Sequence, residues 1–537
     1  MCMLRAMQSV RGVLGAGVLL LFAAIACGEE DGAGPSEPGG SSNSGANGGV
    51  GANGGAAGNP TGGAAGVGGA AGAGGSGTGG SGTGGSGNGG SGNGGSGNGG
   101  NGTGGTGTGG AGTGGTGGAG ATGGDAGAGG SGGTPPECNA SAAPQVGRLN
   151  LSAVVTGLNA ALYAAQPPGS SDFYIVERGG RIRIFTGGAL RSTPFLDVSS
   201  EIQIPAGYDE RGLFSMAFAP DYATSGLFYV VMTPTTGANA NRDQVLEFKR
   251  SSGDPFTADA GSRRAILDLA PGGQEILPLL NQVHNGGTVA FGPDGKLYAG
   301  MGDGGGACNS ARPGVPQDIS SVYGKLLRLD PKAAAPYAAA GNPFASGGDA
   351  RIFHYGLRNP FRFSFDSLNG DLYIGNIGQE SYDEVEFAAA GSSGLNFGWP
   401  DFEGTNSNTC PSGTPLRSGS THTPPIHIID GTSTTALTIA VIGGSVYRGS
   451  AIPRLYGVYV FGEYYPGRPM GALVRCKGQT SPVTPIRKQC DPNAPNDPCF
   501  AAPSGGSGIS ELGAIISGND KELYIVANGT SLLKVVP

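Results

Sequence analysis

The chain has 537 residues, of which 111 are glycine, and charged residues make up 13% of it, against about 25% in an ordinary soluble domain. Glycine is concentrated in residues 28–134, which hold few apolar side chains and cannot offset the entropy cost of ordering. A single 537-residue globule is therefore excluded. The net charge of −8 argues against nucleic acid as a partner, since that binding depends on Lys and Arg neutralising phosphates.

Residues 1–27 are predicted to be an export signal. Arg5 and Arg11 give a positive start, and a short apolar run ends at Ala26-Cys27. Small residues directly before a cysteine resemble a bacterial lipobox, in which that cysteine is acylated and holds the protein on a membrane. The alternative is an ordinary secretory signal with an incidental cysteine. No run of about 20 apolar residues follows residue 30, so the lipid would be the only membrane contact.

This reading predicts an exported protein of the bacterial cell envelope. Gly28 follows the cysteine where an Asp is associated with inner-membrane retention, so we expect an outer-membrane lipoprotein that faces the periplasm or the surface. If the lipobox is incidental, the protein is secreted.

Residues 28–137 are predicted to form a disordered linker rich in Gly, Ser, Asn and Thr. Such a chain behaves as a random coil, and roughly 107 residues of it span about 50–60 Å. Its many GxGxxG matches follow from composition and carry no weight as nucleotide-binding motifs.

Residues 138–537 are predicted to fold, and six cysteines lie in this part: Cys138, Cys308, Cys410, Cys476, Cys490 and Cys499. An even number in an exported chain predicts up to three disulfides, for which fifteen pairings are possible. The Cys490–Cys499 pair would close the shortest loop. Because no CxxC pair occurs, a structural zinc cluster is not expected.

One phrase recurs along the folded part: a turn with Gly or Asp, then an apolar residue, a tyrosine and another apolar residue. Short runs rich in Val, Ile, Phe and Tyr alternate with such turns, which is typical of an all-β protein. The tyrosines recur about every 70 residues at Tyr174, Tyr229, Tyr298, Tyr373, Tyr459 and Tyr524. Six copies predict a six-bladed β-propeller with long loops. The alternative is a β-sandwich with coincidental turns.

The most informative polar pair is His284 and Asp303. His284 lies just before one strand phrase and Asp303 follows that phrase, so a strand pair can return the carboxylate beside the imidazole. A carboxylate there would fix the tautomer and raise the basicity of the imidazole, as a general base requires. The alternative is a loop histidine and an unrelated turn aspartate. The single tryptophan, Trp399, is predicted to be a core or turn residue.

An ordered set of segments around this pair resembles the soluble glucose/sorbosone dehydrogenase family. These proteins are quinoproteins that use pyrroloquinoline quinone and calcium on a six-bladed propeller. The matching segments are 210–213 (ERGL), 217–222 (AFAPDY), 284–298 (HNGGTVAFGPDGKLY), 302–305 (GDGG), 324–331 (GKLLRLDP), 355–362 (YGLRNPFR), 377–384 (IGQESYDE), 396–400 (NFGWP) and 446–449 (VYRG).

The resemblance implies a role for each matching residue. His284 is implied to remove the sugar hydroxyl proton, with Asp303 as its orienting partner. Arg358 and Asn359 are implied to contact the quinone, and the guanidinium would stabilise negative charge that develops there. Glu210 stands near the quinone, where the best-known glucose dehydrogenases have Gln.

The remaining implied contacts hold the cofactor carboxylates and the metal. Arg448 and Arg468 are implied to contact the carboxylates of the quinone. The backbone carbonyls of Gly378 and Gln379 are implied to ligate the cofactor-bound calcium, which prefers oxygen ligands. Glu384 resembles a ligand of a second, structural calcium.

Together these features predict an exported quinoprotein dehydrogenase. It would oxidise an aldose or a related sugar alcohol by His-assisted hydride transfer to the quinone, and pass electrons to an unidentified acceptor. The alternative is a non-catalytic extracellular propeller that is tethered to the cell surface and acts by binding, because fold alone does not decide function.

Overall fold

The computed structural model describes residues 139–537 except 205–208, 270–282, 310–312, 380, 408–409, 411–413, 432–439 and 467. The predicted signal (1–27) and linker (28–137) lie outside the described residues. No helix in the described part is both long and apolar enough to cross a membrane.

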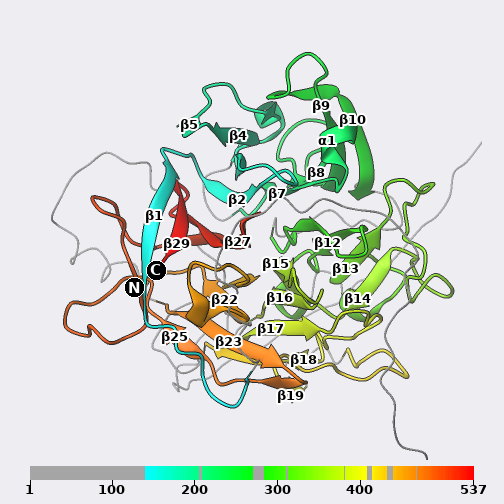
Figure 1. The fold of residues 1–537 in the computed structure, drawn as a ribbon. Coiled ribbons are helices and arrows are strands. Elements are labelled where there is room, and N and C mark those ends of the chain that lie inside the picture. The colour runs from blue at the N-terminus through cyan, green and yellow to red at the C-terminus, as the bar shows by residue number, and fades with distance from the viewer. Residues whose placement is uncertain are drawn as a thin grey trace, which may run out of the picture. The chain divides into compact units, whose positions relative to one another are not determined.

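Strands dominate the fold, and they form six sheets of four or five strands arranged in a ring (Figure 1). Blade 1 contains β2 (Ala161–Ala165), β3 (Phe173–Glu177), β4 (Arg181–Thr186), β5 (Ala189–Leu190) and β6 (Leu196–Asp197). Blade 2 contains β7 (Gly212–Phe218), β8 (Leu227–Thr233), β9 (Asp243–Arg250) and β10 (Ala258–Leu269). Blade 3 contains β11 (Val289–Phe291), β12 (Leu297–Met301), β13 (Lys325–Leu329) and β14 (Ile352–Tyr355).

The second half of the ring repeats this plan. Blade 4 contains β15 (Asn359–Phe365), β16 (Leu372–Ile377), β17 (Tyr382–Ala388) and β20 (His427–Asp430). Blade 5 contains β21 (Val441–Val446), β22 (Val458–Glu463), β23 (Met470–Cys476), β24 (Gln479–Thr480) and β25 (Thr484–Ile486). Blade 6 contains β27 (Leu512–Ser517), β28 (Leu523–Ala527), β29 (Ser531–Val536), β1 (Arg148–Thr156) and β26 (Cys499–Ala501). The predicted six-bladed propeller is confirmed.

A few short elements lie in the loops between strands. A small hairpin, β18 (Phe402–Glu403) with β19 (Asn406–Ser407), lies between β17 and β20 in sequence. The one α-helix among the described residues is α1 (Tyr222–Ser225). The 3-10 helices are Ser199–Glu201, Ala307–Asn309, Val315–Gln317 and Pro453–Leu455.

The two ends of the folded part meet in blade 6. β1, the first strand, pairs antiparallel with β29, the last strand, with Asn150 opposite Val536 (Figure 1). On its other side β1 pairs in parallel with β26. This closure removes an exposed sheet edge from the ring, and exposed edges promote aggregation.

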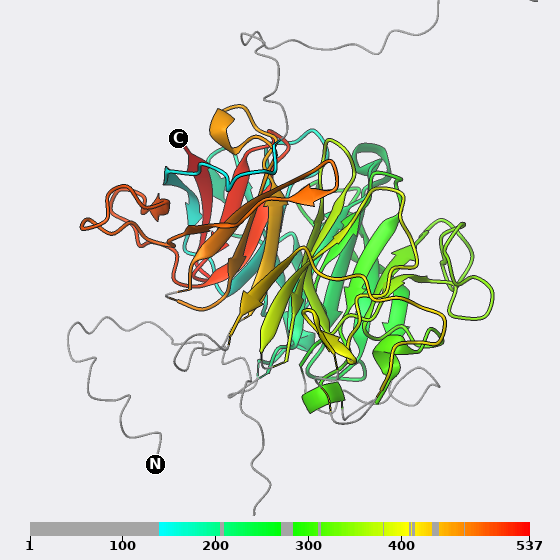
Figure 2. The same cartoon turned by 90° about the horizontal axis from the view of Figure 1, so that it is seen from below.

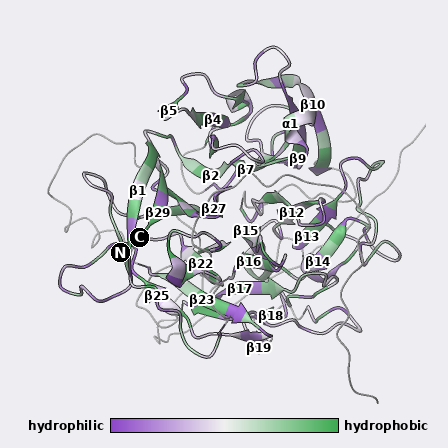
Figure 3. Ribbon diagram, in the orientation of Figure 1, coloured by the Kyte–Doolittle hydropathy of each residue, from purple (hydrophilic) through white to green (hydrophobic). Residues whose placement is uncertain are grey.

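The repeated tyrosines explain why six blades form. Each lies on the second strand of its blade, namely β3, β8, β12, β16, β22 and β28. Neighbouring blades pack against the faces of these strands, and all six tyrosines are buried. Strands such as β1 and β14 contain many apolar residues (Figure 3). Figure 2 shows the strands of neighbouring blades packed side by side.

Disulfides tie down two loops in the described part. Cys490 pairs with Cys499, as the shortest-loop argument predicts, and Cys308 pairs with Cys410. Cys476 is also disulfide-bonded, whereas Cys138 lies outside the described residues.

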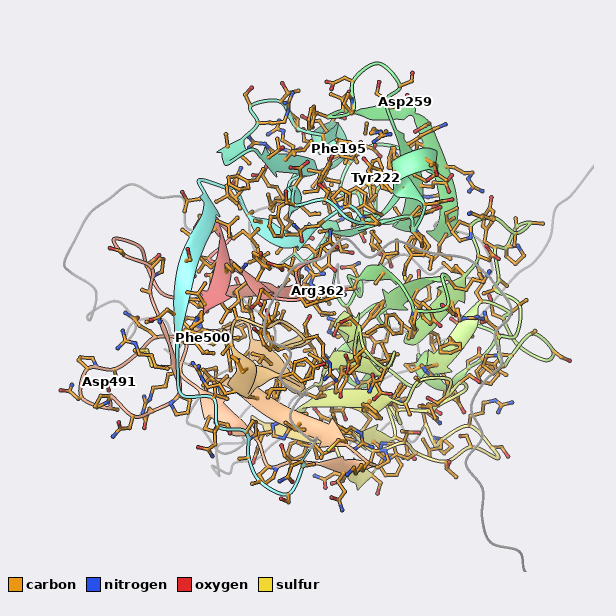
Figure 4. All side chains as sticks on the ribbon, viewed as in Figure 1. Phe195, Tyr222, Asp259, Arg362, Asp491 and Phe500 are labelled. Carbon is orange, nitrogen blue, oxygen red and sulfur yellow. A yellow bond between two sulfur atoms is a disulfide. The ribbon has the colours of Figure 1, made fainter. Side chains whose placement is uncertain are left out.

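The centre of the ring is filled by the guanidinium of Arg362 on β15 (Figure 4). It donates hydrogen bonds to the carbonyls of Gly287 (2.7 Å), Leu162 (3.0 Å), Phe214 (3.2 Å) and Gly513 (3.4 Å). These carbonyls belong to the inner edges of blades 3, 1, 2 and 6. Burial lowers the pKa of Arg362 to about 10, so the group stays charged at neutral pH.

The substitution Arg362→Met is expected to destabilise the ring strongly. It leaves four buried carbonyls without this donor, and hydrogen bonds to charged groups contribute about 1.5–3 kcal/mol each. We expect the free energy of unfolding to fall by at least about 3 kcal/mol, measured by chemical denaturation.

Arg454→Met is the matched control, because Arg454 also donates to two carbonyls, those of Val146 and Arg148 at 2.7 Å, but at the solvent-exposed rim. It should cost less than about 1 kcal/mol. Equal losses for the two variants would contradict a special role for the central guanidinium.

Candidate active site

The candidate site lies at the face of the ring where inner strands begin and second strands end. His284 precedes β11 and Asp303 follows β12. β11 and β12 are antiparallel, with Val289 opposite Ala299, so the start of one and the end of the other lie at the same edge. Blade 4 contributes Arg358 directly before β15 and Gly378 directly after β16 in the same way.

The structure brings His284 and Asp303 together. The distance from His284 Nδ1 to Asp303 Oδ1 is 2.7 Å, and the side chains are 11% and 0% exposed. Because Nδ1 faces the carboxylate, Nε2 is the nitrogen available to accept a proton. Gly302 allows this approach, since a Cβ at that position would collide with the His284 carbonyl.

Glu210 holds the backbone of His284, and its predicted contact with the cofactor stays a prediction. Its Oε2 accepts the His284 backbone N–H at 2.8 Å, and His284 has a φ of 57°. A non-glycine residue in this region of φ is uncommon and is enriched at functional sites. Arg178 from blade 1 braces the Glu210 loop by donating to the carbonyls of Asp209 and Arg211.

The Asp303 carboxylate is surrounded by donors. Besides His284, it accepts hydrogen bonds from the backbone N–H of Gly305 at 2.9 Å and from Trp399 Nε1 at 2.9 Å. Burial alone would raise the pKa of Asp303, but His284, Arg358 and the Gly305 N–H outweigh it and hold the pKa below its usual range. Asp303 is therefore an anion at neutral pH.

Arg358 lies against the same tryptophan, with its guanidinium carbon 5.5 Å from the centre of the Trp399 ring. It is 6% exposed, and its Nη1 donates to the carbonyls of Ile377 (3.2 Å) and Gly378. Within the described residues its buried Nε has no hydrogen-bond partner. The backbone N–H groups of Arg358 and Asn359 both donate to Asn376 Oδ1 at 3.1 Å.

Asn359 joins two blades at the site. Its side-chain Oδ1 accepts the backbone N–H of Gly286 at 3.1 Å, so blade 4 holds the loop that carries His284. The arrangement of His284, Asp303, Arg358 and Asn359 as one cluster therefore depends on direct hydrogen bonds between blades 3 and 4.

The loop with Gly378 and Gln379 is held by carboxylates. The backbone N–H of Gly378 donates to Asp383 Oδ1 at 2.8 Å, and that of Gln379 donates to Glu403 Oε1 at 2.7 Å. Burial and the nearby Glu463 raise the pKa of Asp383. A Cβ at Gly378 would collide with the Tyr382 carbonyl, so only glycine fits there.

Asn376 leads from the site to two more buried carboxyl groups. Its Nδ2 donates to Glu384 Oε2 at 2.7 Å and to Glu386 Oε1 at 3.2 Å. Burial raises the pKa of Glu384 to about 8, and burial together with Glu384 raises the pKa of Glu386. No group of three His, Cys, Asp or Glu side chains that could hold a metal occurs in the described part of the chain.

Arg448 does not join this cluster, which corrects the sequence-based expectation. It follows the far end of β21 and pairs with Asp366 at 2.9 and 2.6 Å, beyond the far end of β15. The short VYRG segment carried no information about which end of its strand faces the site. We therefore remove Arg448 from the cofactor contacts.

Arg468 lies on the same face as the site. It follows β22, whose last residue is Glu463. Burial raises the pKa of Glu463, and the positive charge of Arg468 opposes this effect. With Arg487 and Lys488, Arg468 lines a cavity of about 620 Å³. Asp497 also lines this cavity and pairs with Arg487 at 3.0 Å, so Arg468 and Lys488 carry its net positive charge. The predicted carboxylate contact of Arg468 stays a prediction.

The family model described as glucose/sorbosone dehydrogenase matches residues 163–465, more than half of the chain. The chain belongs to the glucose/sorbosone dehydrogenase family.

Curated relatives of this family member are distant. It is 26% identical over 424 residues to the HIPL2 protein of Arabidopsis thaliana, covering 68% of this chain and 60% of that protein. It is 29% identical over 328 residues to the Hedgehog-interacting protein of Mus musculus, covering 58% and 42%. It is 26% identical over 235 residues to the aldose sugar dehydrogenase YliI of Escherichia coli, covering 43% and 57%. The chain thus spans about three fifths or less of these relatives' lengths.

Solved structures share the fold. The PQQ-bound aldose sugar dehydrogenase of Streptomyces coelicolor aligns with a TM-score of 0.50 at 22% identity, covering 74% of this chain and 99% of that one. The apo form of the Escherichia coli soluble aldose sugar dehydrogenase aligns with a TM-score of 0.53 at 22% identity, covering 72% and 99%.

Sequence reasoning missed three residues of this family member's site. Trp399 is buried, as expected, but it also donates to Asp303. Asn376 and Asp383 hold the backbone of the Arg358 and Gly378 loops. The available signals were that Trp399 and Asp383 lie in matching segments and that Trp399 is the single tryptophan of the chain.

The buried carboxyl pair predicts that stability depends on pH. A carboxyl whose pKa is raised by folding contributes most below its unfolded value near 4.5, and this contribution is lost as the pH rises toward about 8. We expect Glu386→Gln to raise the free energy of unfolding of the calcium-free protein at pH 8, with little effect at pH 5.

Glu247→Gln is the control, because Arg264 contacts this buried carboxylate at 2.8 and 2.7 Å. Loss of that pair should destabilise the protein at pH 8. Denaturation at both pH values measures the effect, and an unchanged pH dependence in Glu386→Gln would contradict the assignment.

Proposed function

We propose that this protein is an exported quinoprotein dehydrogenase that oxidises an aldose or a related sugar alcohol with pyrroloquinoline quinone. The observation that carries the proposal is the cluster around Asp303: its carboxylate orients the His284 imidazole, and the buried Arg358 guanidinium packs on the tryptophan that donates to the same carboxylate. Family membership and the aldose sugar dehydrogenase relatives support the reaction class.

The residues present fit an anionic quinone. Arg358 is a buried cation whose Nε has no partner among the described residues, so an anionic oxygen placed there would satisfy it. Arg468 and Lys488 offer further positive charge on the same face. Asn359 and Arg358 would hold the cofactor, while Glu210 acts through the His284 backbone.

The chemistry that the quinone supplies when bound is acceptance of a hydride from the sugar carbon. The chain's own part is to manage the hydroxyl proton. His284 Nε2 would accept that proton, because Nδ1 already donates to Asp303. The resulting imidazolium would be stabilised by the buried Asp303 anion, and Arg358 would offset negative charge that develops nearby.

Calcium is supported less directly. The predicted ligands are the backbone carbonyls of Gly378 and Gln379, and the Gly378 carbonyl accepts a hydrogen bond from Arg358 in this structure. No side-chain carboxylate among the described residues joins them in a metal-binding group. We keep calcium at this loop, and at Glu384, as a prediction and route no step of the reaction through it.

Export, the lipid anchor at Cys27 and the outer-membrane location are further parts of the proposal, and they rest on residues outside the described part. The sugar substrate is a small molecule, and the electron acceptor is unidentified. The second candidate is a binding module without catalysis, which the relatives named Hedgehog-interacting protein favour.

His284→Ala is expected to separate the two candidates. Apoprotein mixed with pyrroloquinoline quinone and calcium should reduce a dye in the presence of aldoses, and His284→Ala should lower turnover by about 10²–10⁴-fold while the quinone remains bound. Quinone absorbance after desalting and dye reduction measure the two effects.

His427→Gln is the control variant, because His427 lies on β20 away from the cluster. It should keep full turnover. If the wild type neither retains the quinone nor oxidises any sugar of a broad aldose panel, the binding module is the better description.

Calcium removal tests the metal separately. After treatment with a chelator, the protein should lose the quinone on desalting and regain it with added calcium but not with magnesium, which holds its waters more tightly. Absorbance of the retained quinone is the measurement. Equal retention without any divalent ion would remove calcium from the site.

A further inference from the structure

The single tryptophan of the chain lies behind the candidate base. Trp399 is 2% exposed. Both of its backbone polar groups are hydrogen-bonded: its N–H donates to the Gly356 carbonyl at 3.0 Å, and its carbonyl accepts from Gln317 Nε2 at 2.8 Å. The backbone of Trp399 is therefore held by contacts that do not involve Asp303.

The two oxygens of Asp303 have different partners. Oδ1 serves His284 and the Gly305 backbone N–H, whereas Oδ2 accepts the Trp399 indole N–H at 2.9 Å. Asp303 is fully buried, so an anionic oxygen that lost its donor would carry a desolvation penalty. Without the indole N–H, the carboxylate would gain by rotating Oδ2 toward another donor.

Rotation of Asp303 would change which ring nitrogen of His284 is free to accept a proton. With Oδ1 fixed, the proton stays on His284 Nδ1 and leaves the Nε2 lone pair free. A displaced carboxylate would release Nδ1, and an imidazole with its proton on Nε2 cannot accept one there. The same indole also packs against the Arg358 guanidinium, at 5.5 Å from the ring centre.

We propose that Trp399 is a positioning residue of this site: its indole N–H fixes Asp303 in the orientation that keeps His284 in the tautomer with Nε2 free. This role rests on the function proposed above, but the hydrogen-bond chain can be tested without any enzymatic activity. Trp399→Phe keeps an aromatic ring and removes the donor.

The first test reads the tautomer directly. Nitrogen-15 NMR of the full-length apoprotein distinguishes the two ring nitrogens of His284, which is assigned by the loss of its signals in His284→Gln. The wild type should show a single tautomer protonated on Nδ1, and Trp399→Phe should show a mixture. A single, unchanged tautomer in Trp399→Phe overturns the proposal.

Tyr229→Phe is the matched control. Tyr229 is a buried aromatic donor to a carboxylate, at 2.7 Å from Glu247, in blade 2. Its loss removes one hydrogen bond of the same kind and should leave the His284 tautomer unchanged. If this control also produces the mixture, the effect reflects general loosening and the proposal fails.

A second measurement covers the case in which Trp399→Phe does not fold. Because the chain has one tryptophan, its indole N–H gives one resonance. Asp303→Asn replaces the anionic acceptor by an amide and should move this resonance upfield. An unchanged indole resonance shows that Trp399 does not donate to Asp303, and it overturns the proposal.

Kinetics then link the hydrogen bond to turnover. The kinetic test uses protein reconstituted with pyrroloquinoline quinone and calcium. Trp399→Phe should lower kcat by roughly 10-fold, the lower end of the effect of losing a hydrogen-bond partner that supports a site residue. KM should change less than about threefold. An inactive wild type would defeat the proposed function alone, while the NMR result still decides the role of Trp399. An unchanged kcat in an active background overturns the positioning role.

Discussion

The ring depends on one buried cation at its centre. The Arg362 guanidinium reaches carbonyls of four other blades, and a Cβ at Gly443 on blade 5 would collide with the Arg362 carbonyl. A guanidinium is suited to this position because its donors radiate in one plane, so a single side chain can satisfy several inner strands. No acidic side chain is needed, since the carbonyl dipoles supply the negative partners.

This centre bears on the site because Arg362 belongs to the inner strand whose first residues are part of the cluster. β15 begins at Asn359, next to Arg358, and its fourth residue is Arg362. The guanidinium also holds the Gly287 carbonyl, three residues after His284. The position of the imidazole relative to Arg358 is therefore set partly by the same contact that joins the blades.

Much of this arrangement could be predicted from the sequence, because it follows from local order. The tyrosine phrases mark a strand with two neighbours, and that environment recurs in each blade whatever the loops contain. His284 and Asp303 flank one hairpin, so antiparallel pairing alone brings them together. The six-bladed fold and the location of the base follow from such short-range rules.

The rest depends on contacts between distant segments. Arg448 lies at the end of its strand opposite to the expected face, and the residue types of a strand do not say which of its ends faces a ligand. Trp399 reaches Asp303 across 96 residues of sequence, and Arg362 bonds to segments up to 200 residues away. Nothing in their local sequence distinguishes an indole or a guanidinium with a partner from one that only fills space.

The meeting of β1 and β29 has a consequence for how the molecule is made. During synthesis, β1 leaves the ribosome nearly 400 residues before β29, the strand that it pairs with. β1 therefore has no antiparallel neighbour until synthesis is almost complete. Blade 6 can be completed only when residues 531–536 have emerged, and shortening at that end would leave β1 without its antiparallel partner.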